Sequence, residues 1–112
     1  MPEITWEDFE KVDVRVGEVI EAEPFPEARK PSIKLVIDFG GSIGTRRTSA
    51  QLTTHYEPDA LVGHQVVAVV NFPPKRIAGF KSEVLVLGVP DDEGEVVLLS
   101  PDYAVPPGGK MF

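Results

Sequence analysis

Apolar and polar residues alternate with period two along the segment that begins at residue 12. The apolar positions of this first stretch are Val12, Val14 and Val16. At Gly17 the alternation slips by one position, because Glu18 stands where the next apolar residue is due and Val19 resumes the pattern. A phase slip at a glycine is typical of a β-bulge, which bends a strand strongly. The pattern therefore predicts a long first strand that bends at Gly17.

Later segments carry the strand pattern with different strength. The second strand is the clearest, because apolar residues take alternate positions from Ile33 to Phe39 before a Gly40-Gly41 turn. Two later runs are almost continuously apolar, which favours strands buried on both faces. The remaining expected strands are 45–52, which is mostly polar, the two apolar runs 65–72 and 83–89, and a short segment at 95–99.

Two short helical turns interrupt the strands. The first begins at Thr5, which can form a capping box with Asp8. The positions of a hydrophobic staple around it are Ile4 and Phe9. The second turn lies in EPDALVG, with Pro58 near its start and Gly63 just beyond its end. A helix between strands three and four of a small barrel is typical of the OB-fold.

The length and composition fit one such barrel. A chain of 112 residues with 42% hydrophobic side chains can bury one core and has little room for a second. The sequence therefore predicts an all-β protein: a single domain over residues 1–112, built as an OB-fold five-stranded β-barrel. It carries a short N-terminal helix and a short helix between strands 3 and 4.

The ends of the chain and its lack of cysteine bear on the compartment. With no cysteine, there are no disulfides and no thiol nucleophiles. The first residues, MPEITWEDFEKV, are acidic where a signal peptide is basic and then apolar. No apolar run reaches the roughly 20 residues that span a bilayer. We expect a soluble, cytoplasmic protein without membrane insertion.

The charge is unevenly distributed. The chain is acidic overall, with 18 Asp+Glu against 11 Lys+Arg. Residues 29–81, however, carry eight Lys/Arg and only three Asp/Glu, whereas both flanking segments are acidic. The middle of the chain is therefore basic, although solvated charge placed by chance would give the same count.

Catalytic and metal-binding patterns are missing. His55 and His64 lie nine positions apart with no acidic residue at metal-ligand spacing, so no metal site is expected. No G-x-S-x-G or comparable nucleophile motif is present. We therefore expect neither an enzyme nor a bound cofactor.

Three motifs carry a resemblance to a known family. They are DVRVG at Asp13–Gly17, the run Leu61–Gly88 that contains NFPPKRIAGFKSE, and the closing VPPG at 105–108. In this order they resemble the tRNA-binding domain family, which includes the C-terminal appendage of methionyl-tRNA synthetases. The tRNA-binding branches usually have a His-Pro-x-Ala-Asp-Lys-Leu motif, where this chain has FPEARKPSIKL at Phe25–Leu35. This variation is similar to the CsaA branch of bacterial export chaperones.

The resemblance implies an OB-fold homodimer that binds unfolded or precursor polypeptides, with export machinery as a further partner. Binding of tRNA through the basic central surface is the alternative. The resemblance also implies that the N-terminal turn and the C-terminal tail meet at the dimer interface. The expected interface residues are Trp6, Phe9, Val105, Met111 and Phe112.

Site residues follow for each hypothesis. The apolar residues in connectors, expected either to bind peptide or to plug the barrel ends, are Phe25, Ile77 and Phe80. The cations expected to bind tRNA phosphates are Lys30, Lys34, Arg46, Arg47, Lys75, Arg76 and Lys81, with Phe25, Phe39 and Phe80 as stacking platforms. The polar residues expected to fix loop geometry are Arg15, Asn71, Ser82 and Glu83.

Overall fold

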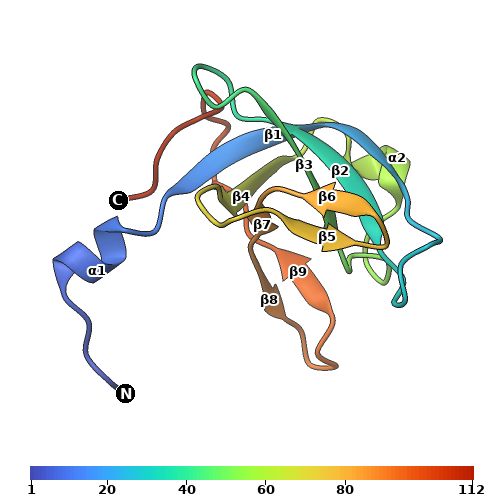
Figure 1. Cartoon of the computed structure of the whole chain (residues 1–112), viewed down its shortest axis with the longest axis horizontal. Coiled ribbons are helices and arrows are strands. Elements are labelled where there is room, and N and C mark those ends of the chain that lie inside the picture. The colour runs from blue at the N-terminus through green and yellow to red at the C-terminus, as the bar shows by residue number, and fades with distance from the viewer.

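Five antiparallel strands form a bent sheet that wraps around one core (Figure 1). The computed structural model describes all residues, 1–112. The sheet has the strand order β3-β2-β1-β4-β7. The predicted OB-fold five-stranded β-barrel is confirmed. The elements in chain order are α1 (Trp6–Glu10), β1 (Val14–Pro24), β2 (Ile33–Asp38), β3 (Thr45–Ala50), α2 (Pro58–Leu61), β4 (Gln65–Val69), β5 (Lys75–Ile77), β6 (Phe80–Ser82), β7 (Leu85–Val86), β8 (Gly88–Pro90) and β9 (Val96–Leu98).

Strand β1 is long enough to pair with two neighbours. Its first half pairs with β4 and its second half with β2. The register shifts between Val19 and Glu21, so the bulge lies at Ile20 rather than at the predicted Gly17. Gly17 pairs regularly, and its role is packing, because a Cβ there would lie 2.5 Å from a methyl carbon of Ile37.

The core is apolar and lines the inside of the barrel. Strand β2 supplies every second residue to it, as its alternation predicted. The buried cluster consists of Val19, Ile33, Leu35, Ile37, Phe39, Leu52, Leu61, Val66, Ala68 and Val84. Thr48 is the one polar residue among the most buried side chains, with 1% of its surface exposed.

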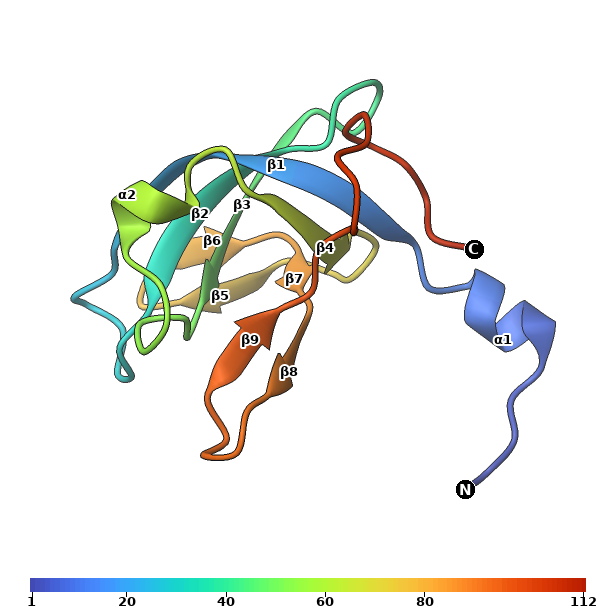
Figure 2. The ribbon, with the colours of Figure 1, turned by 180° about the vertical axis from the view of Figure 1, so that it is seen from behind.

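Both predicted helical turns are present. Thr5 caps α1, accepting a hydrogen bond from the Asp8 N–H while the Asp8 carboxylate accepts one from the Thr5 N–H. In α2, Pro58 stands in the first turn, and Gly63 follows the helix with a φ of +93°. Neither helix has the length and apolar character needed to cross a bilayer. Helix α1 stands away from the barrel, beside the C-terminus (Figures 1 and 2).

Two hairpins lie outside the five-stranded sheet. The apolar run 83–89 does not form one strand but divides into β7 and β8, and β8 pairs with β9 in a hairpin that projects from the barrel (Figure 2). The connector between Pro73 and Lys81 forms the hairpin of β5 and β6. Its turn residues, Ala78 and Gly79, both have positive φ, as a two-residue hairpin turn of type I′ requires.

The sheet edges β3 and β7 meet at a junction that we call the seam, formed by Arg47, Thr48, Ser82, Glu83 and Val84. One backbone hydrogen bond crosses it, from the Glu83 N–H to the Arg47 carbonyl at 2.8 Å. The Thr48 hydroxyl bonds to the Ser82 hydroxyl at 2.9 Å and donates to the Val84 carbonyl at 2.7 Å. The Glu83 carboxylate accepts from the Arg47 N–H at 3.0 Å. Side-chain hydrogen bonds therefore replace most of the backbone ladder that would otherwise join the two strand edges.

The C-terminal tail pairs with the free side of β1. Gly108 donates to the Val16 carbonyl at 2.7 Å, and Val16 donates to the Gly109 carbonyl at 3.0 Å. Gly108 has a φ of +97°, and a Cβ there would lie 2.5 Å from the Phe39 carbonyl oxygen. The irregular tail is therefore docked on the barrel through backbone hydrogen bonds.

Replacement of Thr48 by valine tests the seam. Valine keeps the shape of threonine but removes the donor to the buried Val84 carbonyl and the short hydrogen bond to the Ser82 hydroxyl, which keeps only the 3.4 Å bond from the Ser49 N–H. We expect the free energy of unfolding to fall by about 1–3 kcal/mol, measured by chemical denaturation. Thr45→Val, at an exposed position of the same strand, is the control and is expected to be neutral. Equal stability of the two variants would contradict the role of the seam.

Candidate functional site

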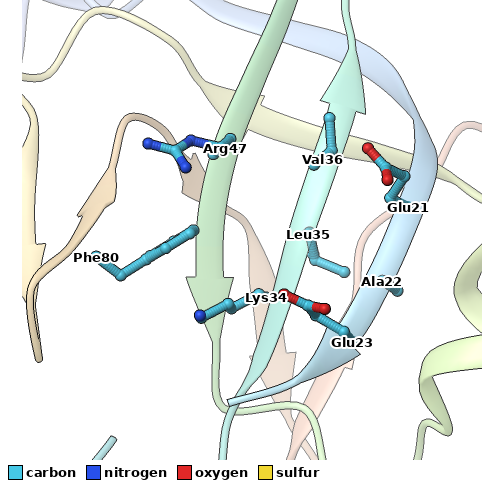
Figure 3. Close-up of a pocket in the computed structure, with 8 residues that line it drawn as sticks. All are labelled: Glu21, Ala22, Glu23, Lys34, Leu35, Val36, Arg47 and Phe80. Carbon is cyan, nitrogen blue, oxygen red and sulfur yellow. The ribbon is translucent and has the colours of Figure 1, made fainter. Parts of the chain in front are cut away.

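An aromatic pair on the outer face of the barrel is surrounded by cations. The rings of Phe25 and Phe80 meet edge to face, with centroids 5.4 Å apart. The Lys34 ammonium lies 4.5 Å from the Phe25 centroid and 5.0 Å from that of Phe80. The Arg47 guanidinium lies 5.2 Å from the Phe80 centroid. We call these four residues the cation–aromatic cluster; Figure 3 shows Lys34, Arg47 and Phe80 converging. Such contacts stabilise a cation over an aromatic face.

Strand alternation and the seam position this cluster. Lys34 points outward between the buried Ile33 and Leu35 of β2, and Arg47 points outward on β3 next to the buried Thr48. Phe80 belongs to β6, which the seam holds against β3 through Ser82. This brings the Arg47 guanidinium over the Phe80 ring, although the two residues are 33 positions apart in the sequence.

The structure brings together four of the seven predicted tRNA-binding cations. Lys34, Arg47, Arg76 and Lys81 line one hollow, which Phe25 and Phe80 also border. The other three lie elsewhere. Lys30 and Lys75 border separate hollows, and the Arg46 side chain points back toward the Ile43 carbonyl at 3.4 Å.

Three carboxylates lie beside these cations. Glu27 lines the same hollow as the four cations. Glu21 and Glu23 line the pocket that also contains Lys34, Arg47 and Phe80 (Figure 3). The bulge at Ile20 is the cause, because without the extra residue the alternation of β1 would turn both glutamates toward the core. Sequence reasoning missed these residues by placing the bulge three residues too early. The candidate nucleic-acid surface is therefore of mixed charge.

The predicted apolar and aromatic ligand contacts divide into buried and accessible residues. Phe25 is only 3% exposed and Phe39 only 1%, so neither can receive a ligand, and Phe25 packs against Phe80 and Lys34 instead. Phe80 is half-buried within the cation–aromatic cluster. Ile77 is half-buried but faces an open depression.

That depression is the most apolar surface near the seam. It consists of two adjoining hollows that share Ile77 and Leu85. Leu85 is 50% exposed and Phe72 53%. Both residues belong to apolar runs that predicted buried strands, so sequence reasoning did not select them. We call this surface the apolar groove, formed by Leu52, Phe72, Ile77, Leu85, Val86 and Val96.

Asn71 and Arg15 connect segments that are distant in sequence. The Asn71 amide accepts from the Asp13 N–H at 2.9 Å and donates to the Lys11 carbonyl at 2.7 Å. Arg15 donates to the Asp13 carboxylate at 2.6 Å and to the Gly108 carbonyl at 3.0 Å. Through its hydrogen bond, the Arg15 guanidinium lowers the pKa of Asp13 below its ordinary value. These bonds support the predicted loop-fixing role, as do those of Ser82 and Glu83 at the seam.

Apolar side chains from both ends of the chain form a second exposed surface. We call it the terminal apolar patch, lined by Trp6, Phe9, Val12, Met111 and Phe112. Trp6, the only tryptophan of the chain, is 81% exposed. Val105, also expected at an interface, lies apart from this patch, where its N–H and carbonyl bond to the Gln65 side chain.

Neither histidine lines any of the hollows described above. His55 pairs with Asp91 at 2.7 Å and lowers the pKa of that carboxyl, which ties the β3–α2 connector to the β8–β9 hairpin. His64 is exposed. No group of three or more His, Cys, Asp or Glu side chains is arranged to hold a metal ion.

Comparison with known proteins shows that similar domains occur both alone and within larger enzymes. Residues 14–110 match the family described as "Putative tRNA binding domain". The methionine–tRNA ligase of Methanocaldococcus jannaschii is 38% identical over 111 residues, covering 99% of this chain but 17% of the ligase. The chain thus spans about a sixth of the length of such curated relatives.

Three crystal structures match over nearly the whole of both chains. The chaperone CsaA from Bacillus anthracis is 54% identical with a TM-score of 0.92, covering 99% of this chain and 100% of that chain. The CsaA chaperone protein from Picrophilus torridus is 51% identical with a TM-score of 0.90, covering 98% and 100%. A MetRS-related protein from Pyrococcus horikoshii is 28% identical with a TM-score of 0.87, covering 100% of each chain.

The Asp13–Arg15 pair gives a test of how the tail is held. Because the folded-state pKa of Asp13 is below its unfolded value of about 3.9, the ionised carboxylate stabilises the fold. This stabilisation is complete above the unfolded pKa and is lost as the pH falls through the lowered folded pKa. We expect Asp13→Asn to be less stable than the wild type at pH 6, with the difference shrinking below pH of about 4, measured by denaturation across pH. The exposed carboxyl of Asp102 is the control, and a constant difference for Asp13→Asn would refute the assignment.

Proposed function

This chain belongs to the tRNA-binding domain family, and on that basis we propose that it is a polypeptide-binding chaperone of the CsaA type. It acts as a non-enzymatic homodimer in the cytoplasm, where it holds unfolded or precursor polypeptides for export machinery. The likeness to two CsaA chaperones over the full length of both chains supports this proposal. The relation to methionine–tRNA ligases concerns only one domain of those enzymes.

The observation that carries the proposal is the exposed apolar groove. Unfolded polypeptides differ from folded ones in presenting apolar side chains and free backbone, so a protein that holds them needs accessible apolar surface. The groove supplies half-exposed Phe72 and Leu85 beside half-buried Ile77. Cations border the groove at Lys30 and Lys75, giving the apolar surface a polar rim.

The terminal apolar patch supports the homodimer. A chain of this size gains stability by burying exposed aromatic surface against a second copy. Trp6 and Phe112 are almost fully exposed in the single chain, and both belong to the patch. A twofold contact through this patch covers them while leaving the apolar groove and the cation–aromatic cluster accessible.

Binding of tRNA is the second candidate, and one observation favours it. Four cations, Lys34, Arg47, Arg76 and Lys81, converge beside the half-buried ring of Phe80. Cations with an adjacent ring suit phosphate contact and base stacking. Glu21 and Glu23 on the same face oppose a polyanion, however, and the whole chain has a net charge of −7. We therefore rank polypeptide binding first.

Suppression of client aggregation tests the first function. The wild type should reduce light scattering by an unfolded precursor, and Leu85→Ser should weaken this effect several-fold because it removes apolar surface from the groove. The matched control is Val62→Ser, since Val62 is also 50% exposed but lies beyond α2. Circular dichroism checks that both variants fold. Equal suppression by the two variants would remove the groove from the mechanism.

Salt-dependent titration with tRNA tests the second function. If the cation cluster binds phosphates, Arg76→Ala with Lys81→Ala should lower the slope of log affinity against log salt by about 1.4–1.8. Glu21→Gln with Glu23→Gln should raise the affinity, because two repulsive charges disappear. Lys11→Ala, at the C-terminal end of α1 and outside the cation hollow, is expected to leave the slope unchanged. Absent or salt-insensitive binding would reject the tRNA hypothesis.

A further inference from the structure

The two edge strands of the barrel diverge beyond the seam. Strands β3 and β7 stand at opposite ends of the strand order, so each has an edge without a full ladder. Past the seam, Ser49 and Ala50 lie on one side of the apolar groove, and Leu85 and Val86 lie on the other. The Ser49 N–H, which points away from β2, donates only a long 3.4 Å hydrogen bond to the Ser82 hydroxyl. The barrel therefore has a short opening with strand edges on both sides.

We propose that an extended client segment enters this opening and pairs its main chain with the strand edges, as an added β-strand. This inference rests on the polypeptide-binding function proposed above and specifies how binding occurs. Edge strands present unpaired N–H and C=O groups, which recognise any extended backbone. Successive side chains of the added strand point to opposite faces, so every second one packs on Ile77, Leu85 or Val96. Main-chain pairing suits a protein whose clients differ in sequence.

The charges along the groove select among clients. Three cations border it, Arg29, Lys30 and Lys75, and none forms an ion pair within the chain. Only two carboxylates oppose them, and one of these, Glu83, is already engaged at the seam. Glu27 is the other. The preferred occupant is therefore an apolar extended segment with acidic flanks, not one with basic flanks, because complementary charge favours association.

Three labelled peptides of about eight residues separate these ideas, since strands of that length are common. All share an alternating apolar centre. The first has acidic flanks, the second has basic flanks, and the third is the acidic peptide with N-methyl groups on alternate backbone nitrogens of one edge. Fluorescence anisotropy measures their affinities for the full chain. We expect the acidic peptide to bind about three- to tenfold more tightly than the basic one, and N-methylation to weaken binding at least tenfold.

A graded charge series on the protein provides the matched control. Arg29→Gln with Lys30→Gln should abolish the preference for acidic flanks, and Arg29→Glu with Lys30→Glu should invert it. N-methylation should weaken binding to the same extent in both variants, because neither change touches the strand edges. A preference that survives charge reversal would overturn the selectivity.

The outcomes distinguish this inference from the function on which it rests. If the N-methylated peptide binds as well as its parent, main-chain pairing is wrong, whatever the chaperone activity. If no peptide binds while the protein still suppresses client aggregation, the opening is not the binding site and the chaperone function stands. If aggregation suppression is also absent, the proposed function itself is refuted.

Discussion

The hydrogen bonds of Thr48 are the constraint on which the other features of the barrel depend. A five-stranded sheet with two free edges can close only if a contact joins the β3 edge to the β7 edge. Here the buried Thr48 hydroxyl of β3 makes that contact by bonding to Ser82 and Val84, just before β7. The same contact fixes the β5–β6 hairpin and so brings Phe80 over Lys34. It is also short, so the edges diverge beyond it and leave the apolar groove open. The same short contact therefore explains both why the barrel closes at Thr48 and why the apolar groove beside it stays open.

The fold was largely predictable because its strongest signals are local. The alternation of β2, the capping box of α1 and the Pro58–Gly63 turn each depend on a few neighbouring residues, and all three are present. The bulge was misplaced because glycine has two uses in a strand. Gly17 serves close packing against Ile37, whereas the extra residue is the apolar Ile20. Only the partner strand distinguishes these uses.

The candidate surfaces were less predictable because they depend on which side of a strand each residue faces. Charge counts identified the basic segment, but only pairing shows that Arg47 joins the cluster while Arg46 turns away. The β5–β6 hairpin was missed because Ala78 is an unusual residue at a positive φ, where Asn or Gly is the usual signal. The outward position of Glu21 follows from the bulge, so that error carried into the estimate of surface charge.

The pairing of the C-terminal tail with β1 has a kinetic consequence. Arg15 and Gly108 are separated by 93 positions, and their contact therefore closes almost the whole chain into a loop. Contacts of such long sequence separation form slowly, since the entropy of loop closure is lost before the contact compensates for it. We therefore expect the tail to dock late in folding, after β1 and β4 have paired. Because Met111 and Phe112 complete the terminal apolar patch, that patch is assembled only once the tail has docked on β1.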